Sequence, residues 1–147
     1  MGNNLKFLLT GATGFVGSAV LKCLSAGNSE IVCVTRGAGS RDVLNKHCTI
    51  LKTFNLFSNS TEWWAEACKD IDVVVHIAWY VEPGKYLNSP MNLECLEGSL
   101  RLAEGAVKAG VKRFVGIGTC FEYDLSYGVL SSDTPLKPSS IYSSSKA

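Results

Sequence analysis

The sequence predicts an α/β protein built on a doubly wound parallel sheet. Short apolar runs of strand length alternate along the chain with longer segments of helical periodicity. These runs are continuously apolar, as in parallel strands that are covered on both faces. A loop with the spacing Gly11-x-x-Gly14-x-x-Gly17 joins the first run to the first helical segment. Together they predict a Rossmann-type sheet with the strand order 3-2-1-4-5.

The first half of the chain contains three strand candidates and two helix candidates. Apolar residues recur at helical spacing after Gly14, and Gly27 with Asn28 provides a stop signal. Residues 37–48 are polar, and we expect a loop there. The predicted strands are Leu5–Leu9, Ile31–Val34 and a weaker Thr49–Phe54, and the predicted helices are Gly14–Ala26 and Thr61–Lys69.

The second half contains two strand candidates and the longest helix. Asp72–Ala78 is the clearest strand, and Arg113–Gly118 is the fifth. Between them, Met91–Ala109 has helical periodicity and Gly110 follows as its C-terminal stop. A long loop then leads to a helix that begins near Tyr142. In the earlier helix, Trp63 and Trp64 are expected to pack against the sheet, with at least one of them partly exposed.

Composition excludes several classes of protein. The 147 residues correspond to one domain, with 46% hydrophobic and 18% charged residues and a formal net charge of +1. The sequence has no run of basic residues that would indicate nucleic-acid binding. The longest apolar stretch is broken by His76, which we interpret as a core histidine rather than a metal ligand, and it is too short to span a bilayer. With no secretory signal, we expect a cytoplasmic protein whose six cysteines are reduced.

The glycine loop is the first site candidate. Gly11 allows a sharp turn after the strand, Gly14 allows the backbone to approach a pyrophosphate, and Gly17 allows the helix to pack closely on the sheet. The pyrophosphate would lie at the helix N-terminus, where amide groups and the helix dipole favour an anion. A tight turn without a ligand is the alternative, but the flanking strand and helix favour a dinucleotide.

The end of the second strand indicates which dinucleotide is preferred. An acidic residue there would bind the ribose hydroxyls of NAD. This chain has Thr35 and Arg36 instead, and a guanidinium suits a 2′-phosphate. The sequence therefore favours NADP over NAD, the alternative being that Arg36 is only a solvated loop charge.

Tyr142 and Lys146 form the second site candidate. Four residues apart, they lie on the same face of the predicted helix. A free tyrosine has a pKa of about 10, and a nearby ammonium would lower it toward the range useful for proton transfer. The pair follows the fifth strand, where catalytic groups of such sheets gather.

These motifs, taken in order, resemble those of the extended short-chain dehydrogenases/reductases, in the NAD-dependent epimerase/dehydratase family that acts on nucleotide sugars. The resemblance covers the chain from residue 5 onward. It depends on residues 10–17, on Asp72 and the segment 76–78, on residues 110–115 and 118–123, and on the segment from Pro135 to Lys146.

The resemblance implies a role for individual residues. Thr119 would hold the substrate oxygen, Tyr142 would exchange a proton with it, and Lys146 would bind the nicotinamide ribose and tune Tyr142. Asn55 would accept a hydrogen bond from the adenine amino group. The remaining cofactor contacts implied are Gly11, Thr13, Gly14, Phe15, Val16, Gly17, Thr35, Arg36, Leu56, Ile77, Ala78 and Trp79, the last two on the nicotinamide side.

Three departures from the family pattern narrow the range of reactions that the resemblance implies. Dehydratases of this type place Asp-Glu after the catalytic threonine, where this chain has Cys120 and Phe121. Cys95 replaces a frequent asparagine, for which Asn92 is at best a substitute, and Trp79 is bulkier than usual. The resemblance therefore implies 4-keto reduction or epimerisation of a nucleotide sugar.

The resemblance also implies that residues 1–147 are an incomplete NAD(P)-binding domain. Family members continue into a substrate domain that is absent here, so we expect the chain by itself to bind cofactor weakly and the full-length form to be a homodimer. A non-catalytic NADP-binding module and a plant-type reductase of small aromatic ketones are the alternatives.

Overall fold

The computed structural model describes residues 4–36 and 48–147, which form two compact units. The first unit comprises residues 4–36, 48–78 and 98–116, and the second comprises residues 79–97 and 117–147. The polar loop predicted at 37–48 lies outside the described residues, except for its last residue, Cys48.

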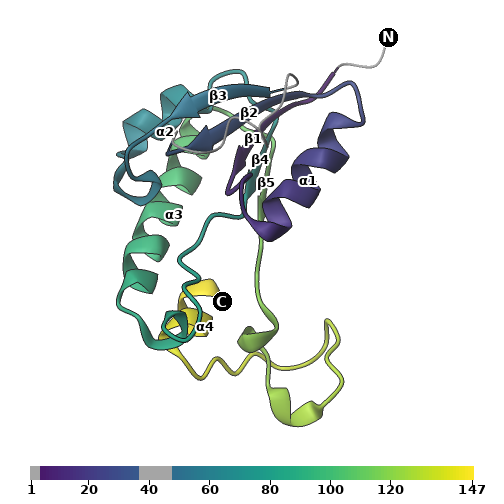
Figure 1. The fold of residues 1–147 in the computed structure, drawn as a ribbon, viewed down its shortest axis with the longest axis vertical. Coiled ribbons are helices and arrows are strands. Elements are labelled where there is room, and N and C mark those ends of the chain that lie inside the picture. Colours follow the sequence, from purple (N-terminus) through teal and green to yellow (C-terminus); the bar gives the residue numbers. More distant parts are fainter. Residues whose placement is uncertain (1–3, 37–47) are drawn as a thin grey trace. The chain divides into compact units, whose positions relative to one another are not determined.

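A parallel sheet of five strands forms the centre of the first unit (Figure 1). Its order, β3-β2-β1-β4-β5, confirms the predicted Rossmann-type topology. Some strands end earlier than predicted, because the residues after His76 and Gly116 leave the ladder. The strands are β1 (Lys6–Thr10), β2 (Glu30–Thr35), β3 (Cys48–Lys52), β4 (Val73–His76) and β5 (Arg113–Gly116).

Helices cover both faces of this sheet. Helix α1 (Phe15–Ser25) lies on one face and α2 (Thr61–Ala67) on the other (Figure 1). Because side chains alternate along a strand, neighbouring residues enter different cores. Leu8 packs in the cluster on the α2 side and Leu9 in the cluster on the α1 side, and both are fully buried.

Two glycines bring the long helix α3 (Met91–Lys108) close to its neighbours in the first unit. A Cβ at Gly98 would lie 2.5 Å from Cα of Phe57, and one at Gly105 would lie 2.5 Å from Cβ of Trp64. Trp64 is completely buried and packs edge-to-face with the half-buried Trp63, which confirms the prediction for this pair. These contacts fix α3 against α2 and against Phe57, which precedes α2.

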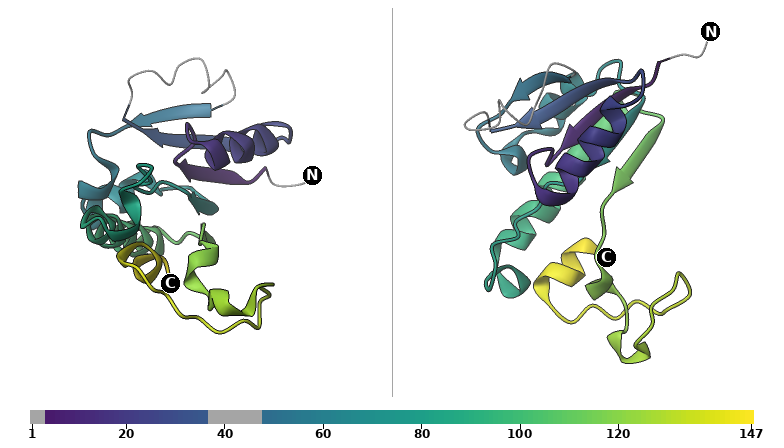
Figure 2. Two further views of the ribbon diagram at one scale, coloured as in Figure 1. Left: turned by 60° about the horizontal axis from the view of Figure 1, so that its bottom comes forward. Right: turned by 45° about the vertical axis from the view of Figure 1, so that its right-hand side comes forward.

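The second unit is built from short helices. They are η2 (Tyr86–Asn88), the first turns of α3, η3 (Cys120–Glu122), η4 (Leu125–Tyr127) and α4 (Ile141–Lys146). Helix α4 packs against η2 and η3 (Figure 2). A bridge between Tyr123 and Leu136 and the hydrogen bond from Lys137 N to Glu122 O at 2.8 Å join the two sides of the loop that precedes α4. This loop returns the chain from η3 to α4.

The strand β5 forms an open edge of the sheet in the first unit. All four of its residues are exposed, and Phe114 and Val115 each expose more than a third of their surface. No helix among the described residues has both the length and the apolar character needed to cross a membrane.

Candidate functional site

Close backbone packing explains the spacing of the glycine loop. Gly11 has φ +75°, and a Cβ there would lie 2.6 Å from the backbone nitrogen of Ala78. A Cβ at Gly17 would overlap the carbonyl oxygen of Gly11. Only glycine fits at these two positions: the left-handed conformation and the close contact exclude a side chain at Gly11, and the close contact alone excludes one at Gly17. The turn can therefore pass directly from β1 into α1, past the end of β4.

The N-terminus of α1 provides the chemistry that a pyrophosphate requires. Gly14 is the N-cap residue, and no side chain in the described part of the chain caps the helix there. The first turn also carries no acidic residue, so its amide groups and dipole can act on an anion. Thr13, Phe15 and Val16 are exposed around it, with Phe15 96% exposed. The loop therefore fits a dinucleotide.

Thr10 connects the ends of β1 and β4 beside this loop. Its Oγ1 accepts hydrogen bonds from the backbone nitrogens of Ile77 at 3.2 Å and Ala78 at 3.3 Å. Its hydroxyl proton is then directed at Nδ1 of His76, 2.7 Å away, so that the imidazole accepts at Nδ1. Nε2 consequently carries the proton and donates to Ser99 Oγ at 2.7 Å. This confirms His76 as a hydrogen-bonded core histidine.

The predicted adenosine contacts have different environments. Arg36 follows β2 and is exposed, and Thr35 is half-buried. Asn55 is the N-cap of η1 (Leu56–Ser58), where its Oδ1 accepts a hydrogen bond from Phe57 N at 3.1 Å. Leu56 is buried in the core on the α2 side. Asn55 therefore has a structural role as a cap, which uses one of the two acceptor positions of its oxygen.

In the second unit, Thr119 and Tyr142 lie together. The Thr119 hydroxyl is close enough to act on the ionisation of Tyr142, and Tyr142 is only 8% exposed. Burial raises the pKa of Tyr142, and the neighbouring Thr119 side chain opposes that rise. The charges of neighbouring groups, including Glu122, raise this pKa further. The prediction of a lowered tyrosine pKa is therefore wrong in this structure: desolvation of the phenolate dominates.

Lys146 contacts two groups of the same unit. Its Nζ donates a hydrogen bond to the carbonyl oxygen of Ile117 at 2.6 Å and lies 4.2 Å from the centroid of the Trp79 ring. Burial lowers the pKa of Lys146, while the charges of Glu122 and Cys95 act in the opposite direction. The ammonium is thus partly desolvated and held between a carbonyl and an aromatic face.

Glu122 positions the backbone that carries Thr119, a role that sequence reasoning did not find. Its Oε1 accepts a hydrogen bond from Thr119 N at 2.7 Å, and Thr119 Oγ1 accepts from Phe121 N at 3.4 Å. This reciprocal arrangement is a capping box at η3. The T-x-x-E spacing of residues 119–122 is the sequence signal that could have revealed it.

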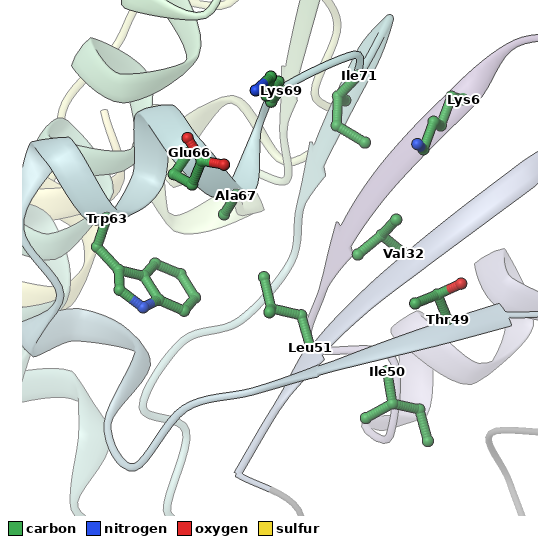
Figure 3. Close-up of a pocket in the computed structure, with 10 residues that line it drawn as sticks. All are labelled: Lys6, Val32, Thr49, Ile50, Leu51, Trp63, Glu66, Ala67, Lys69 and Ile71. Atoms are coloured by element: carbon green, nitrogen blue, oxygen red, sulfur yellow. The ribbon is translucent and has the colours of Figure 1, made fainter.

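A separate cavity of about 370 Å³ lies between α2 and the strands β1 to β3 (Figure 3). Lys6 lies at the amino end of β1, whereas the glycine loop follows the carboxyl end of that strand. Ligands of open α/β sheets bind outside the carboxyl ends of the strands. The cavity is therefore distinct from the predicted cofactor site. Its lining residues are Lys6, Val32, Thr49, Ile50, Leu51, Trp63, Glu66, Ala67, Lys69 and Ile71.

A family model matches residues 7–147, which include both the glycine loop and the Thr119–Tyr142 pair. The chain belongs to the NAD dependent epimerase/dehydratase family. No curated protein matches it significantly. Within the family, the chain spans only about half the length, 45 to 57%, of the solved structures that it matches.

Solved structures similar to this family member share its fold. The enzyme WbmG of Bordetella bronchiseptica, in complex with NAD and UDP, is 25% identical, with a TM-score of 0.76 over 98% of this chain and 47% of WbmG. The UDP-glucose 4-epimerase of Thermus thermophilus, in complex with NAD, is 24% identical, with a TM-score of 0.81 over 97% of this chain and 47% of that enzyme. For the UDP-Glc/GlcNAc 4-epimerase of Campylobacter jejuni the identity is 20% and the TM-score 0.83, over 97% of this chain and 46% of that enzyme.

Proposed function

We propose that the chain is the cofactor-binding part of an NAD(P)-dependent enzyme that epimerises a nucleotide sugar or reduces its 4-keto form. The observation that carries the proposal is the placement of the buried Tyr142 beside Thr119, with Lys146 one helical turn from the tyrosine on α4. The similar enzymes support the substrate class, since one is named as a complex with NAD and UDP.

The glycine loop would hold the pyrophosphate of the cofactor. Amide groups in the first turn of α1 would donate hydrogen bonds to its oxygens. Gly14 would leave space for these oxygens, because a Cβ built there would meet only the Gly11 carbonyl oxygen, at 3.4 Å. When bound, a nicotinamide dinucleotide supplies hydride-transfer chemistry. The fit of this loop supports a dinucleotide of either type.

Thr119 and Tyr142 would carry out the proton transfer to the substrate oxygen. With its raised pKa, the Tyr142 phenol is protonated at neutral pH, so Oη can donate a proton to a substrate carbonyl oxygen as that oxygen becomes an alcohol. Thr119 Oγ1 orients the same oxygen. The Lys146 ammonium favours the phenolate that remains on Tyr142 after the proton has moved.

Arg36 supports a preference for NADP. It is exposed directly after β2, where a guanidinium can pair with a 2′-phosphate. The similar enzymes whose cofactor is named are complexes with NAD, so the preference depends on this residue alone. Replacing Arg36 by Glu should reverse the ratio of NADPH to NADH affinity.

The complete enzyme would be longer than this chain and dimeric. Enzymes of the same fold are about twice as long, and Phe114 and Val115 of β5 are partly exposed, as expected if further elements cover them. Exposed apolar residues recur every seven positions along α3, a spacing that supports a helical subunit interface. They are Leu93, Leu100 and Val107.

The test is a hydride-transfer assay of the chain joined to its adjoining coding sequence. A panel of nucleotide 4-keto sugars is assayed with NADPH and NADH, followed by absorbance at the nicotinamide band. Tyr142→Phe should reduce turnover at least 100-fold, as loss of a general acid does, whereas the exposed Tyr127→Phe should not change it. Failure to retain either dinucleotide would overturn the proposal. Retention with indifference to Tyr142→Phe would identify a non-catalytic binding module instead, and turnover only of small aromatic ketones would exclude the sugar substrate.

A further inference from the structure

Asn92 is a completely buried amide in the first turn of α3. Its Nδ2 donates hydrogen bonds to the carbonyl oxygens of Tyr86 at 2.6 Å and Ser89 at 2.9 Å. Its Oδ1 accepts a hydrogen bond from Nε1 of Trp79 at 2.9 Å. Both amide protons are therefore used, and they fix the direction in which Oδ1 points.

The Trp79 indole is oriented by this bond. An indole has a single N–H donor, so its bond to Asn92 restricts rotation of the ring. The face of that ring lies 4.2 Å from Nζ of Lys146, within the range of a cation–π interaction. Lys146 is thereby held from two directions, by the ring and by the Ile117 carbonyl oxygen at 2.6 Å.

The same asparagine also supports the neighbour of Tyr142. The rings of Tyr86 and Tyr142 pack edge-to-face, with centroids 4.8 Å apart and planes at 88°. Asn92 holds the Tyr86 backbone through the 2.6 Å hydrogen bond. The buried Asn92 side chain thus connects Tyr86, which packs against Tyr142, with Trp79, which packs against Lys146.

We infer that Trp79, oriented by Asn92, is a positioning residue that holds the Lys146 ammonium on the face of α4 that carries Tyr142. The inference rests on the proposed function. A partly buried ammonium loses hydration, and the electron-rich face of an indole replaces part of that loss. A leucine of similar apolar character would leave the ammonium without this contact. A phenylalanine would keep an aromatic face but lose the bond to Asn92.

The first test measures the reactivity of Lys146 in the chain itself. Wild type, Trp79→Phe and Trp79→Leu are treated with limiting acetic anhydride, and acetylation is quantified by mass spectrometry relative to the exposed Lys22 of the same sample. Tyr80→Leu is the matched control, an aromatic-to-leucine change at the adjacent residue. Trp79→Leu should raise the relative rate on the order of tenfold, the factor that corresponds to a partly desolvated cation–π contact. Trp79→Phe should lie between wild type and Trp79→Leu, and Tyr80→Leu should match wild type.

Equal rates in wild type and Trp79→Leu would overturn the inference, as would equal rates in Trp79→Phe and Trp79→Leu. If a variant fails to fold, the unmodified chain provides the test. The ε-methylene protons of Lys146 should be shifted upfield of those of the exposed Lys22 in its NMR spectrum, because they lie beside the face of the Trp79 ring. An unshifted signal would contradict the contact.

The second test separates this inference from the proposed function. In the longer polypeptide, Trp79→Leu should lower kcat of hydride transfer with KM for the sugar nucleotide unchanged, and Trp79→Phe should recover part of kcat. If the polypeptide shows no turnover but Lys146 becomes reactive in Trp79→Leu, the proposed function fails while the role of Trp79 in holding Lys146 stands. If turnover occurs and is unaffected by Trp79→Leu, the positioning role fails.

Discussion

Thr10 and His76 are 66 positions apart in the sequence, yet Oγ1 of the threonine lies 2.7 Å from Nδ1 of the histidine. The threonine also accepts both backbone amides that follow β4. A hydroxyl combines one donor with two acceptor positions, so this single side chain satisfies three polar groups at the end of two adjacent strands. The turn that precedes the glycine loop is therefore tied directly to the turn after β4.

Replacement of Thr10 by Val keeps the shape of the side chain but removes these hydrogen bonds. Because Thr10 is fully buried, the groups left without partners should lower the free energy of unfolding by about 2–4 kcal/mol. Urea unfolding followed by circular dichroism measures the change. Thr10→Ser, which retains the hydroxyl, is the control, and equal losses in the two variants would contradict the role of the hydrogen bonds.

Gly17→Ala should destabilise the first unit, since the new methyl group would overlap the Gly11 carbonyl oxygen. Overpacking of this kind costs about 1–3 kcal/mol. The matched control is Gly116→Ala, where a Cβ would meet nothing within 4 Å. Thermal unfolding of both variants tests the prediction, which is refuted if their midpoints fall equally.

The raised pKa of Tyr142 makes stability depend on alkaline pH. The unfolded chain loses this proton near pH 10, while the folded chain retains it to higher pH. Stability from this group is therefore complete below pH 10 and is lost as pH rises through the folded-state pKa. Urea unfolding between pH 8 and 11 should show a smaller decline in Tyr142→Phe than in Tyr127→Phe. A decline of the same size in both would mean that Tyr142 titrates normally.

The cysteines should react with alkylating reagents according to their burial. Burial, together with the neighbouring Cys48, raises the pKa of Cys33 to about 12, and burial alone raises that of Cys68 to about 11. Cys23 and Cys120 are exposed. Iodoacetamide at pH 8 should therefore modify the exposed pair and leave Cys33 and Cys68 unmodified until denaturant is added. Peptide mass spectrometry of the labelled chain gives the answer, and native labelling of Cys33 would contradict its burial.

Asp124 should contribute to stability in acid. Hydrogen bonds from Ser126 and the Lys137 ammonium lower the pKa of Asp124 to about 2, from 3.8. A depressed folded-state pKa gives stability that is present above pH 3.8 and lost as pH falls toward 2. Asp124→Asn keeps an oxygen acceptor but removes the charge, so its urea midpoint should change less between pH 4 and pH 2 than that of wild type. An identical acid dependence in the two proteins would exclude Asp124 as a contributor.

The sheet and the glycine loop could be predicted because their signals are local. Continuous apolar runs identify buried parallel strands, and a glycine spacing records close backbone contacts, such as those of Gly11 with Ala78. The same patterns predicted that Trp63 and Trp64 pack with at least one of them partly exposed, and that His76 is hydrogen-bonded in the core, but not which tryptophan is buried. Strand ends were less predictable, because the segments 77–78 and 117–118 are apolar or small but leave the ladder to form the loops at its carboxyl edge.

The surroundings of Tyr142 could not be predicted, since they depend on residues distant in the sequence. The spacing of Tyr142 and Lys146 suggested a lowered tyrosine pKa, but that argument counts one neighbouring charge and omits desolvation, which dominates in the structure. Similarly, the bond between Trp79 and Asn92 joins a loop to a helix start 13 residues later. No local sequence pattern at either residue indicates that the two are in contact.

Helix α4 begins with a capping box in which Ser140 and the fully buried Ser143 satisfy one another's backbone amides. So short a helix has little stability of its own, and this local network fixes where Tyr142 points. The exposed faces of Ile141 and Ser144 take no part in the network. With the exposed Cys23 and Cys120 replaced by serine, a cysteine introduced at Ser144 could consequently carry a fluorescent or spin label two residues from Tyr142 while leaving the anchoring of the phenol intact, which would give a direct optical or magnetic reporter of ligand arrival.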